Sequence, residues 1–275
     1  MKTQEERLNY LIEKFKEEFL EYKDFPVPTD IKDKKVLLRS LMNIRPPKET
    51  SAEILKVQDE YLTERNKEKG IVYLKDIKTI KETINSKHPY SQKISIWQGD
   101  ITNLSCDAIV NAANSKMLGC FTPMHICIDN CIHTFAGVQL RYECNKIMNE
   151  FKKKFGTDYQ QPTSVPIITD GYNLPAKKVI HITGPVVIGK LTKNLEIDLK
   201  KCYKNILEKC IENNLKSVAF CCISTGVFRF PNKRAAEIAV ETITSWLKQN
   251  ENKIDRIIFN VFKPEDKYCY EQFLQ

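Results

Sequence analysis

The sequence of 275 residues lacks any long uninterrupted apolar run, and it holds only 9 glycines. No window approaches the roughly 18 consecutive apolar residues that a membrane-spanning helix requires. The first residues are charged and lead directly into an amphipathic pattern, so we expect no signal peptide. These absences argue against the membrane and secreted classes and favour a cytoplasmic protein.

Blocks of like charge are also missing, although 43 basic residues outnumber 35 acidic ones and the net charge is +8. This balance is compatible with an anionic ligand, but interleaved charges are also the ordinary pattern of a solvated surface. Aromatic residues do not alternate with a basic strip, so the charge does not favour a nucleic-acid partner. The sequence contains no internal repeat and no low-complexity segment.

Cysteine is absent from the first third of the chain, and glycine nearly so. All ten cysteines follow residue 90, and Gly70 is the one glycine before it. Without an export signal, thiols are expected rather than disulfides. The change in composition predicts a helical N-terminal subdomain over residues 1–90 and a second domain over residues 91–275.

Apolar spacing predicts the secondary structure of both parts. In the first part, it predicts helices over residues 8–19, over residues 34–41, and from a capping box of Thr50 and Glu53 to about residue 62. In the second part, strands are predicted over 94–98, 108–111, 165–168, 178–183, 217–222 and 256–262, and helices over 132–151, 196–213, 232–249 and from Pro264. Such alternation indicates an α/β fold with a mostly parallel sheet covered on both faces. Ligands of such sheets bind at the carboxyl ends of the strands.

The loop of residues 224–231, between a predicted strand and a predicted helix, has features of an anion-binding site. Gly226 permits close approach of the main chain, Ser224 and Thr225 offer hydroxyl donors, and the helix that follows offers unpaired N–H groups. Phe228 and Phe230 could stack on a ribose or a base. The alternative is an ordinary strand-to-helix turn with two core phenylalanines.

A second loop carries Cys120, His125 and Cys127, followed by Cys131. Two thiolates and an imidazole within eight residues can hold one zinc ion. The alternative is a set of small buried cysteines beside a surface histidine. If Cys131 supplied a fourth ligand, the site would be closed and structural, and if not, one coordination position would stay open, as in catalytic zinc sites. We expect Cys131 not to be a ligand, because it falls where a helix should begin.

The ordered motifs of the second part resemble the macrodomain family. They are Gln98-Gly99-Asp100-Ile101-Thr102, Asp107-Ala108-Ile109-Val110-Asn111-Ala112-Ala113-Asn114, Ile132-His133 with Ala136-Gly137, Gly171-Tyr172-Asn173-Leu174-Pro175-Ala176, Val179-Ile180-His181, Gly184-Pro185 and Ile223-Ser224-Thr225-Gly226. The resemblance implies a three-layer α/β/α fold with a mixed, mostly parallel sheet. It also implies ADP-ribose as the ligand, which many macrodomains hydrolyse from proteins.

The segment from Gly119 to Asn130 is similar to the zinc-containing microbial subclass of that family, some members of which are encoded beside sirtuin-type ADP-ribosyltransferases. The helical N-terminal part also suits this subclass. The Cys/His segment replaces the glycine-rich run that is usual in the family, so the glycine-loop contacts are not carried over. Arg229 stands where many macrodomains have a small residue, which leaves the local phosphate geometry open.

The resemblance gives roles to individual side chains. Asp100 can accept from the exocyclic amine of adenine, and Asn114 suits the vicinal hydroxyls of the distal ribose. Asp129 can orient or deprotonate a water molecule, whereas we interpret His133, four residues later, as structural. The predicted sites are for catalysis Asn114 and Asp129, for zinc Cys120, His125 and Cys127, and for ligand binding Asp100, Ile101, Asn114, Ser224, Thr225, Gly226, Val227, Phe228 and Asn260, with Phe262 beside the last.

Each of these assignments has a purely structural alternative. A carboxylate such as Asp100 or Asp129 is common as a helix cap or at a helix start, and Asn114 could form an Asx turn. For Asn260 and Phe262, placement in the core is nearly as good an explanation.

The sequence as a whole is thus predicted to encode a zinc-dependent hydrolase that frees mono-ADP-ribose from modified protein side chains. The expected partners are the modified protein, ADP-ribose and a sirtuin-type transferase system. The rival hypotheses are a non-catalytic ADP-ribose reader with a structural zinc ion and an esterase that acts on O-acyl-ADP-ribose.

Overall fold

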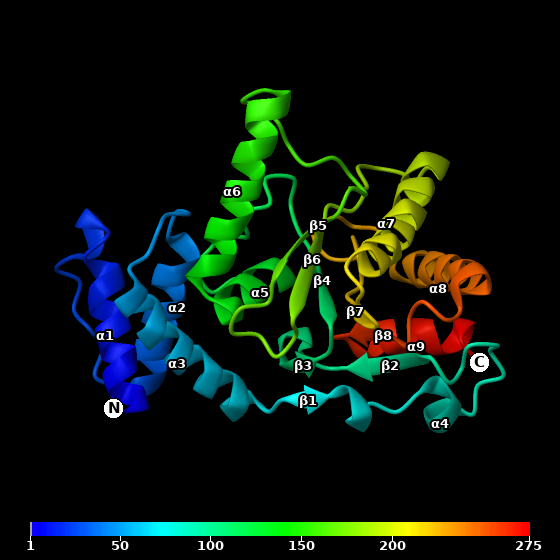
Figure 1. Ribbon diagram of the computed structural model, residues 1–275, viewed down its shortest axis with the longest axis horizontal. Coiled ribbons are helices and arrows are strands. Elements are labelled where there is room, and N and C mark those ends of the chain that lie inside the picture. The colour runs from blue at the N-terminus through cyan, green and yellow to red at the C-terminus, as the bar shows by residue number, and fades with distance from the viewer. Residues whose placement is uncertain (1) are drawn as a thin grey trace. The chain divides into compact units, whose positions relative to one another are not determined.

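The computed structural model describes residues 2–275, which pack into two compact units (Figure 1). Unit 1 holds the described residues up to Gly70, residues 116–159 and residues 172–174, and unit 2 holds the rest. This grouping differs from the expected division into residues 1–90 and 91–275, because the chain leaves unit 1 after Gly70 and returns to it twice. The two compact units describe how the chain packs, and the expected domain boundary near residue 90 stays a prediction.

Unit 1 is built from helices. They are α1 (Gln4–Lys16), the 3₁₀ turn η1 (Leu20–Tyr22), α2 (Ile31–Ile44), α3 (Ala52–Lys69), α5 (Ile128–Ala136) and α6 (Val138–Phe155). One apolar core contains residues from four of these helices: Leu11 of α1, Leu41 of α2, Tyr61 of α3 and Val138 of α6. The three N-terminal helices and the start of α6 therefore share one core.

Helix boundaries follow capping chemistry, which corrects two sequence predictions. α3 is capped by Ser51, whose side chain accepts from the Ile54 N–H, and not by Thr50. The single helix predicted over residues 132–151 is two helices, because Gly137 adopts a φ of 103° and interrupts them. The uninterrupted apolar spacing concealed this break.

Unit 2 is built around a six-stranded sheet with the order β2-β8-β7-β4-β6-β5. The strands are β2 (Ile94–Gln98), β4 (Ala108–Ala112), β5 (Ile167–Asp170), β6 (Lys178–Ile182), β7 (Ser217–Phe220) and β8 (Arg256–Val261). All neighbouring strands pair in parallel except β5, which is antiparallel to β6. The expected mixed, mostly parallel sheet is therefore confirmed.

The other elements of unit 2 are α7 (Lys193–Glu212), α8 (Asn232–Asn250), α9 (Pro264–Phe273), the short α4 (Ile80–Ile84), the 3₁₀ turns η2 (Leu74–Asp76) and η3 (Ile101–Asn103), and a parallel pair of β1 (Val72–Tyr73) and β3 (Leu104–Ser105). Within this unit α7 packs on α8, and α8 packs on α9. The sequence patterns did not predict α4, β1 or β3, because elements of two to five residues are too short for a periodic signal.

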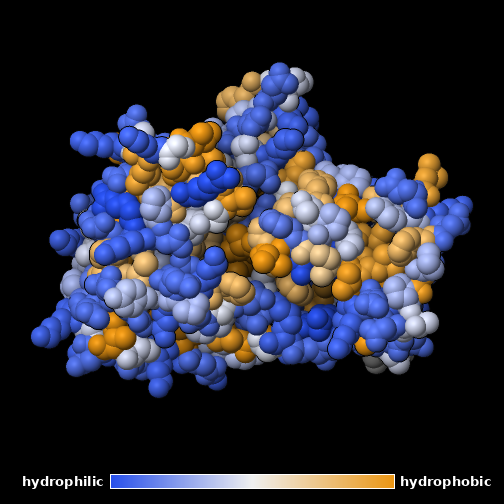
Figure 2. All heavy atoms as spheres, turned by 180° about the vertical axis from the view of Figure 1, so that it is seen from behind, coloured by the Kyte–Doolittle hydropathy of each residue, from blue (hydrophilic) through white to orange (hydrophobic). Residues whose placement is uncertain are grey.

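The surface is mainly polar on the face drawn in Figure 2, where hydrophobic residues gather in smaller areas between hydrophilic ones. Among the helices of residues 2–275, none combines the length and the apolar character needed to cross a bilayer.

His181 is a polar group inside the sheet. It is fully buried in β6, where its Nδ1 lies 3.0 Å from Asn111 Nδ2 and its Nε2 lies 2.9 Å from Thr169 Oγ1. Burial lowers the pKa of His181 to about 3, because the charged imidazolium loses its hydration there. The unfolded chain has an ordinary histidine pKa, so below about pH 6.5 it binds a proton that the folded chain does not.

We therefore expect acid to destabilise the fold through His181. Lowering the pH from 6.5 to 5 should cost about 1.5 kcal/mol of unfolding free energy from this one group. Urea unfolding at both pH values measures the effect, and His181→Gln, which cannot titrate, should show a correspondingly smaller pH dependence. An equal pH dependence in the two proteins would contradict the assignment.

Candidate functional site

Parallel pairing places the candidate ligand residues of unit 2 along one edge of the sheet. Asp100 follows β2, Phe262 follows β8, the loop of residues 224–231 follows β7, and Asn114 follows β4. Because these four strands are parallel, their carboxyl ends lie at the same edge of the sheet. The strand order sets the 224–231 loop between Asp100 on one side and Asn114 on the other.

The loop after β7 presents unsatisfied donors. The main-chain N–H groups of Gly226, Val227 and Phe228 have no acceptor within residues 2–275, and neither does the buried Oγ of Ser224. Consecutive main-chain N–H groups without acceptors can bind an anion. The N-terminus of α8 follows directly and has no side-chain cap, which adds positive dipole. This loop therefore has the donors that a phosphate or diphosphate group requires.

The shape of this loop is fixed from within unit 2. Ser224 has a φ of 66°, a strained value for a residue with a side chain. The Val187 N–H donates to the Phe228 carbonyl at 2.9 Å, and the Thr225 hydroxyl donates to the Cys222 carbonyl at 3.0 Å. A Cβ atom on Gly184 would collide with Ser224 Oγ, so only glycine fits there. Thr225 thus shapes the loop, and Ser224 Oγ lies buried against Gly184.

Asn260 of β8 contacts the main chain next to Asp100, at the end of the sheet edge away from Asn114. Its Nδ2 donates to the Gly99 carbonyl at 3.0 Å and to the Trp97 carbonyl at 3.4 Å. Asp100 accepts from the Thr102 N–H at 2.9 Å and from its hydroxyl at 2.6 Å. The amide of Asn260 therefore positions the turn that carries Asp100. The side chain of Ile101 is buried, so Ile101 offers a ligand only its main chain.

Unit 1 carries the second set of predicted residues in the segment 116–127, here called the metal loop. The ligand atoms of Cys120, His125 and Cys127 all lie within 4.8 Å of one another. Cys120 Sγ and His125 Nδ1 are 3.5 Å apart. Around a tetrahedral zinc ion, a sulfur ligand and a nitrogen ligand are separated by about 3.5 Å, so the donor set fits zinc. Cys131 is not part of this cluster, and its Sγ lies 3.6 Å from Arg39 Nη2.

Cys127 is the N-cap residue of α5. Its Sγ accepts from the Asn130 N–H at 3.4 Å, and the helix dipole favours negative charge there. Without a metal, burial, together with the nearby Cys120 and Asp129, raises the pKa of the Cys127 thiol to about 12. Coordination to a cation removes that penalty, because a zinc-bound thiol is deprotonated.

Asp129 and His133 lie one turn apart on α5, and both side chains are buried. Asp129 Oδ1 is 3.5 Å from His133 Nε2. The His133 ring packs against the main chain of Gly119, where an added Cβ would come within 2.9 Å of the ring. The ring thus supports the metal loop, which agrees with a structural role for His133.

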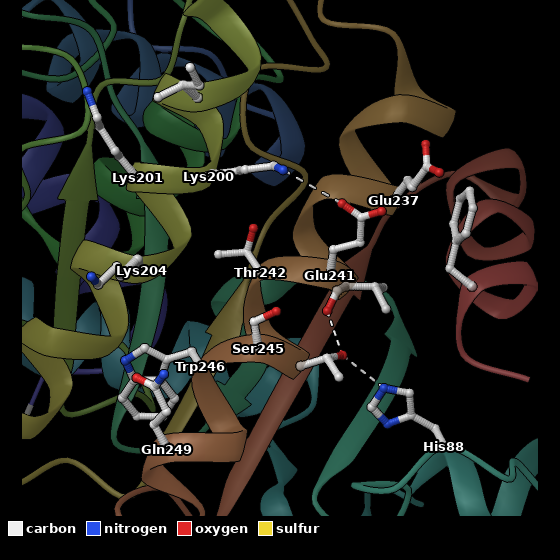
Figure 3. A pocket seen from close by; sticks show the side chains of 14 residues that line it. His88, Lys200, Lys201, Lys204, Glu237, Glu241, Thr242, Ser245, Trp246 and Gln249 are labelled. Atoms are coloured by element: carbon white, nitrogen blue, oxygen red, sulfur yellow. Dashed lines mark hydrogen bonds and ion pairs between the residues drawn. The ribbon is translucent and has the colours of Figure 1, made fainter. Parts of the chain in front are cut away.

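A groove of about 780 Å³ elsewhere in unit 2 contains none of the predicted site residues. Side chains of α7 and α8 line it, with His88 at one side (Figure 3). Lys200 Nζ and Glu241 Oε2 approach to 3.8 Å across it, and His88 Nε2 lies 2.9 Å from Thr244 Oγ1. The groove offers neither a metal cluster nor a row of main-chain donors.

Sequence reasoning missed the residues that hold the metal loop. Arg39 Nη2 donates to the His125 carbonyl, Asn43 accepts from the Met124 N–H, and Asn130 donates to the Thr122 carbonyl. Arg39 and Asn43 lie on an ordinary amphipathic helix, 86 and 81 residues before the loop residues that they contact, and no local pattern marks them. Asn130 carried a weak signal, since it lies within the Cys/His segment itself.

Comparison with known proteins gives the context for these two sets of residues. A family model described as Macro domain matches residues 110–239. The chain is 47% identical over 272 residues to a Treponema medium protein named Protein-ADP-ribose hydrolase, with 99% of each chain covered. It is 42% identical over 276 residues to a Staphylococcus aureus (strain MRSA252) protein of the same name, covering 99% of this chain and 96% of that one.

Solved structures agree with the sequence matches. A Trypanosoma brucei macrodomain in complex with ADP-ribose superposes with a TM-score of 0.64 at 26% identity, over 86% of this chain and 95% of that one. An Oceanobacillus iheyensis macrodomain with ADP superposes with a TM-score of 0.58 at 34% identity, over 66% of this chain and 89% of that one.

The contact between Gly119 and His133 leads to a prediction. We expect Gly119→Ala to lower the zinc content of purified, dialysed protein strongly, because the new methyl group displaces either the His133 ring or the metal loop. Gly189→Ala is the matched control, since Gly189 has the same φ of 79° but no atom within 4 Å of an added Cβ. Both variants should lose about 1–2 kcal/mol of stability from backbone strain. Equal zinc content in the two variants would show that the contact does not support the loop.

Proposed function

This chain belongs to the macrodomain family, and on that premise we propose that it is a zinc-dependent hydrolase that removes mono-ADP-ribose from modified protein side chains. The observation that carries the proposal is the row of free main-chain donors at residues 226–228, flanked along the sheet edge by Asp100 and Asn114. The chain is 42–47% identical, over nearly its full length, to proteins named Protein-ADP-ribose hydrolase, and this similarity supports the proposed reaction.

The order of these groups matches the order of parts in ADP-ribose. The diphosphate accepts from residues 226–228 and from the Ser224 hydroxyl. Adenine lies toward Asp100, whose carboxylate can accept from an exocyclic amine as well as from Thr102, because it has two oxygens. The ring of Phe262, 72% exposed, offers a stacking face beside it. The distal ribose then lies toward Asn114.

Hydrolysis breaks the bond between the anomeric carbon of the distal ribose and the acceptor side chain, and water supplies the new hydroxyl group. Asn114, which offers a donor and an acceptor, orients the ribose hydroxyls. Asp129 accepts the proton that the attacking water loses and passes it to the acceptor side chain as that group leaves. Cys120, His125 and Cys127 would hold zinc, which when bound would supply a Lewis acid for a substrate oxygen.

The proposal extends to the origin of the substrate. A sirtuin-type ADP-ribosyltransferase would supply proteins that carry one ADP-ribose, which this chain would release as free ADP-ribose.

A turnover assay on mono-ADP-ribosylated protein tests the proposal, run with metal-replete protein and with protein stripped by a chelator. We expect turnover by the first, loss of turnover in the second, and recovery when zinc is returned. Calorimetry with ADP-ribose should show binding in both, because the donors at residues 226–228 do not depend on the metal. Binding without turnover in the replete protein would indicate a reader. Exclusive turnover of O-acyl-ADP-ribose would indicate an esterase.

We expect Asn114→Ala to slow hydrolysis by roughly a hundredfold or more, since a lost hydrogen-bond partner of the reacting sugar costs about 3 kcal/mol in the transition state. Ser115→Ala is the control, because the Ser115 hydroxyl donates to Gln160 Oε1 at 2.6 Å, outside the proposed site. The measurement is single-turnover kinetics with circular dichroism to check the fold. Near wild-type turnover by the Asn114 variant would show that Asn114 is a turn residue only.

A further inference from the structure

We propose that Arg39 and Asn43 of α2 are positioning residues for the metal loop, because they fix the main chain on both sides of His125. The inference rests on the zinc site of the proposed function and goes beyond it, since neither residue is a metal ligand. It assigns the N-terminal helical part a direct task in holding the metal.

α2 is a rigid support for this purpose. Its start is capped by Asp30, which accepts from the Lys32 N–H at 2.7 Å and from the Asp33 N–H at 3.3 Å. Its apolar side is buried in the core of unit 1. Its last turn is held by Arg141, whose Nη1 donates to the carbonyls of Met42, Asn43 and Arg45. The helix is therefore fixed at both ends and along one side.

Two side chains on one face of α2 reach the metal loop. Arg39 and Asn43 are four residues apart and so lie one above the other. Arg39 Nη2 donates to the His125 carbonyl at 2.8 Å, and Asn43 Oδ1 accepts from the Met124 N–H at 3.0 Å. These two bonds hold the main chain on either side of the His125 ligand.

The main chain at this point needs such support. The His125 N–H donates back to the Thr122 carbonyl at 3.2 Å and closes a four-residue turn. Pro123 is the second residue of the turn, and Met124 is the third, with a φ of 57°. A type II turn requires a positive φ at its third residue, where glycine or asparagine is usual. Methionine there is strained, so bonds from outside the turn are needed to keep it closed.

Asn130 connects Arg39 to the first arm of the loop. Its Oδ1 accepts from Arg39 Nη2 at 2.9 Å, while its Nδ2 donates to the Thr122 carbonyl at 2.9 Å and to the Cys120 carbonyl at 3.3 Å. Asn130 is fully buried. Through it, the same guanidinium group also restrains the main chain at Cys120.

Every hydrogen bond that the structure shows for Arg39 goes to the metal loop or to the first residues of α5, at Asn130 and Cys131. Within residues 2–275 it forms no ion pair, and its Nε is buried without a partner. A charged group placed this way costs desolvation without a carboxylate in return. The bonds to His125 and to these two residues of α5 are the gain that the structure shows for it.

The test measures zinc affinity, by competition with a chromogenic chelator, in the full-length protein. We expect Arg39→Ala and Asn43→Ala each to weaken zinc binding about 10–100-fold, the usual effect of removing a partner that orients a metal ligand. Lys32→Ala is the control, since Lys32 is an exposed cation of the same helix, and it should bind zinc like the wild type. Unfolding midpoints of the metal-free proteins show whether each variant folds.

A rescue separates positioning from general support of the fold. Glycine adopts a positive φ without strain, so Met124→Gly added to Asn43→Ala should restore much of the zinc affinity. If Arg39→Ala fails to fold, Arg39→Lys keeps the charge without the planar fork and should still weaken zinc binding.

Wild-type zinc affinity in both Arg39→Lys and Asn43→Ala, or no rescue by Met124→Gly, would overturn the inference. Failure of the wild type itself to bind zinc would overturn this inference together with the zinc-dependent function, and the wild-type measurement distinguishes the two cases.

Discussion

The parallel pairing of β4 with β6 on one side and β7 on the other is the constraint on which the candidate ligand site of unit 2 depends. Parallel strands send their carboxyl ends to one edge, so every loop that follows them emerges there. Buried side chains fill the strands themselves, and β4 is buried along most of its length. Chemistry is thereby confined to the loops, and the strand order alone determines which functional groups are neighbours.

The metal loop depends on a different kind of constraint. Its three candidate metal ligands come from eight consecutive residues, but their main chain is held by α2 and by Asn130 of α5. The two sets of functional residues are thus supported separately. The sheet edge offers main-chain donors whose position follows from strand pairing, whereas the metal loop relies on side-chain bonds to a helix that is distant in sequence.

This difference explains what could be predicted from the sequence. The six strands of the larger sheet were predictable because alternation and apolar runs are local, and the Cys/His cluster was predictable because its residues are close in sequence. The break between α5 and α6 at Gly137 was not predictable, because a single glycine within a segment of helical apolar spacing is also compatible with one continuous helix. The free N–H groups at residues 226–228 could be expected only as a loop with a glycine, because their lack of acceptors depends on the folded loop.

Arg39 and Asn43 were beyond prediction for a further reason. Their partners lie 86 and 81 residues along the chain, and such contacts leave no trace in a single sequence. The buried His181 was recorded only as part of a motif, because its low pKa follows from complete burial, which only the packed sheet shows. The roles of individual site residues in binding and catalysis remain predictions.

Unit 1 is assembled from three separate stretches of chain, and this has a consequence for the order of events during synthesis. The bond from Arg141 to the end of α2 joins residues 99 positions apart. At about 5–20 residues per second, a ribosome adds that length in about 5–20 s. For that interval the end of α2 exists without the Arg141 side chain that holds it, while much of the sheet has not yet been made. The N-terminal helices are therefore the first part translated, but their core can be completed only after the segment 116–159 has been made.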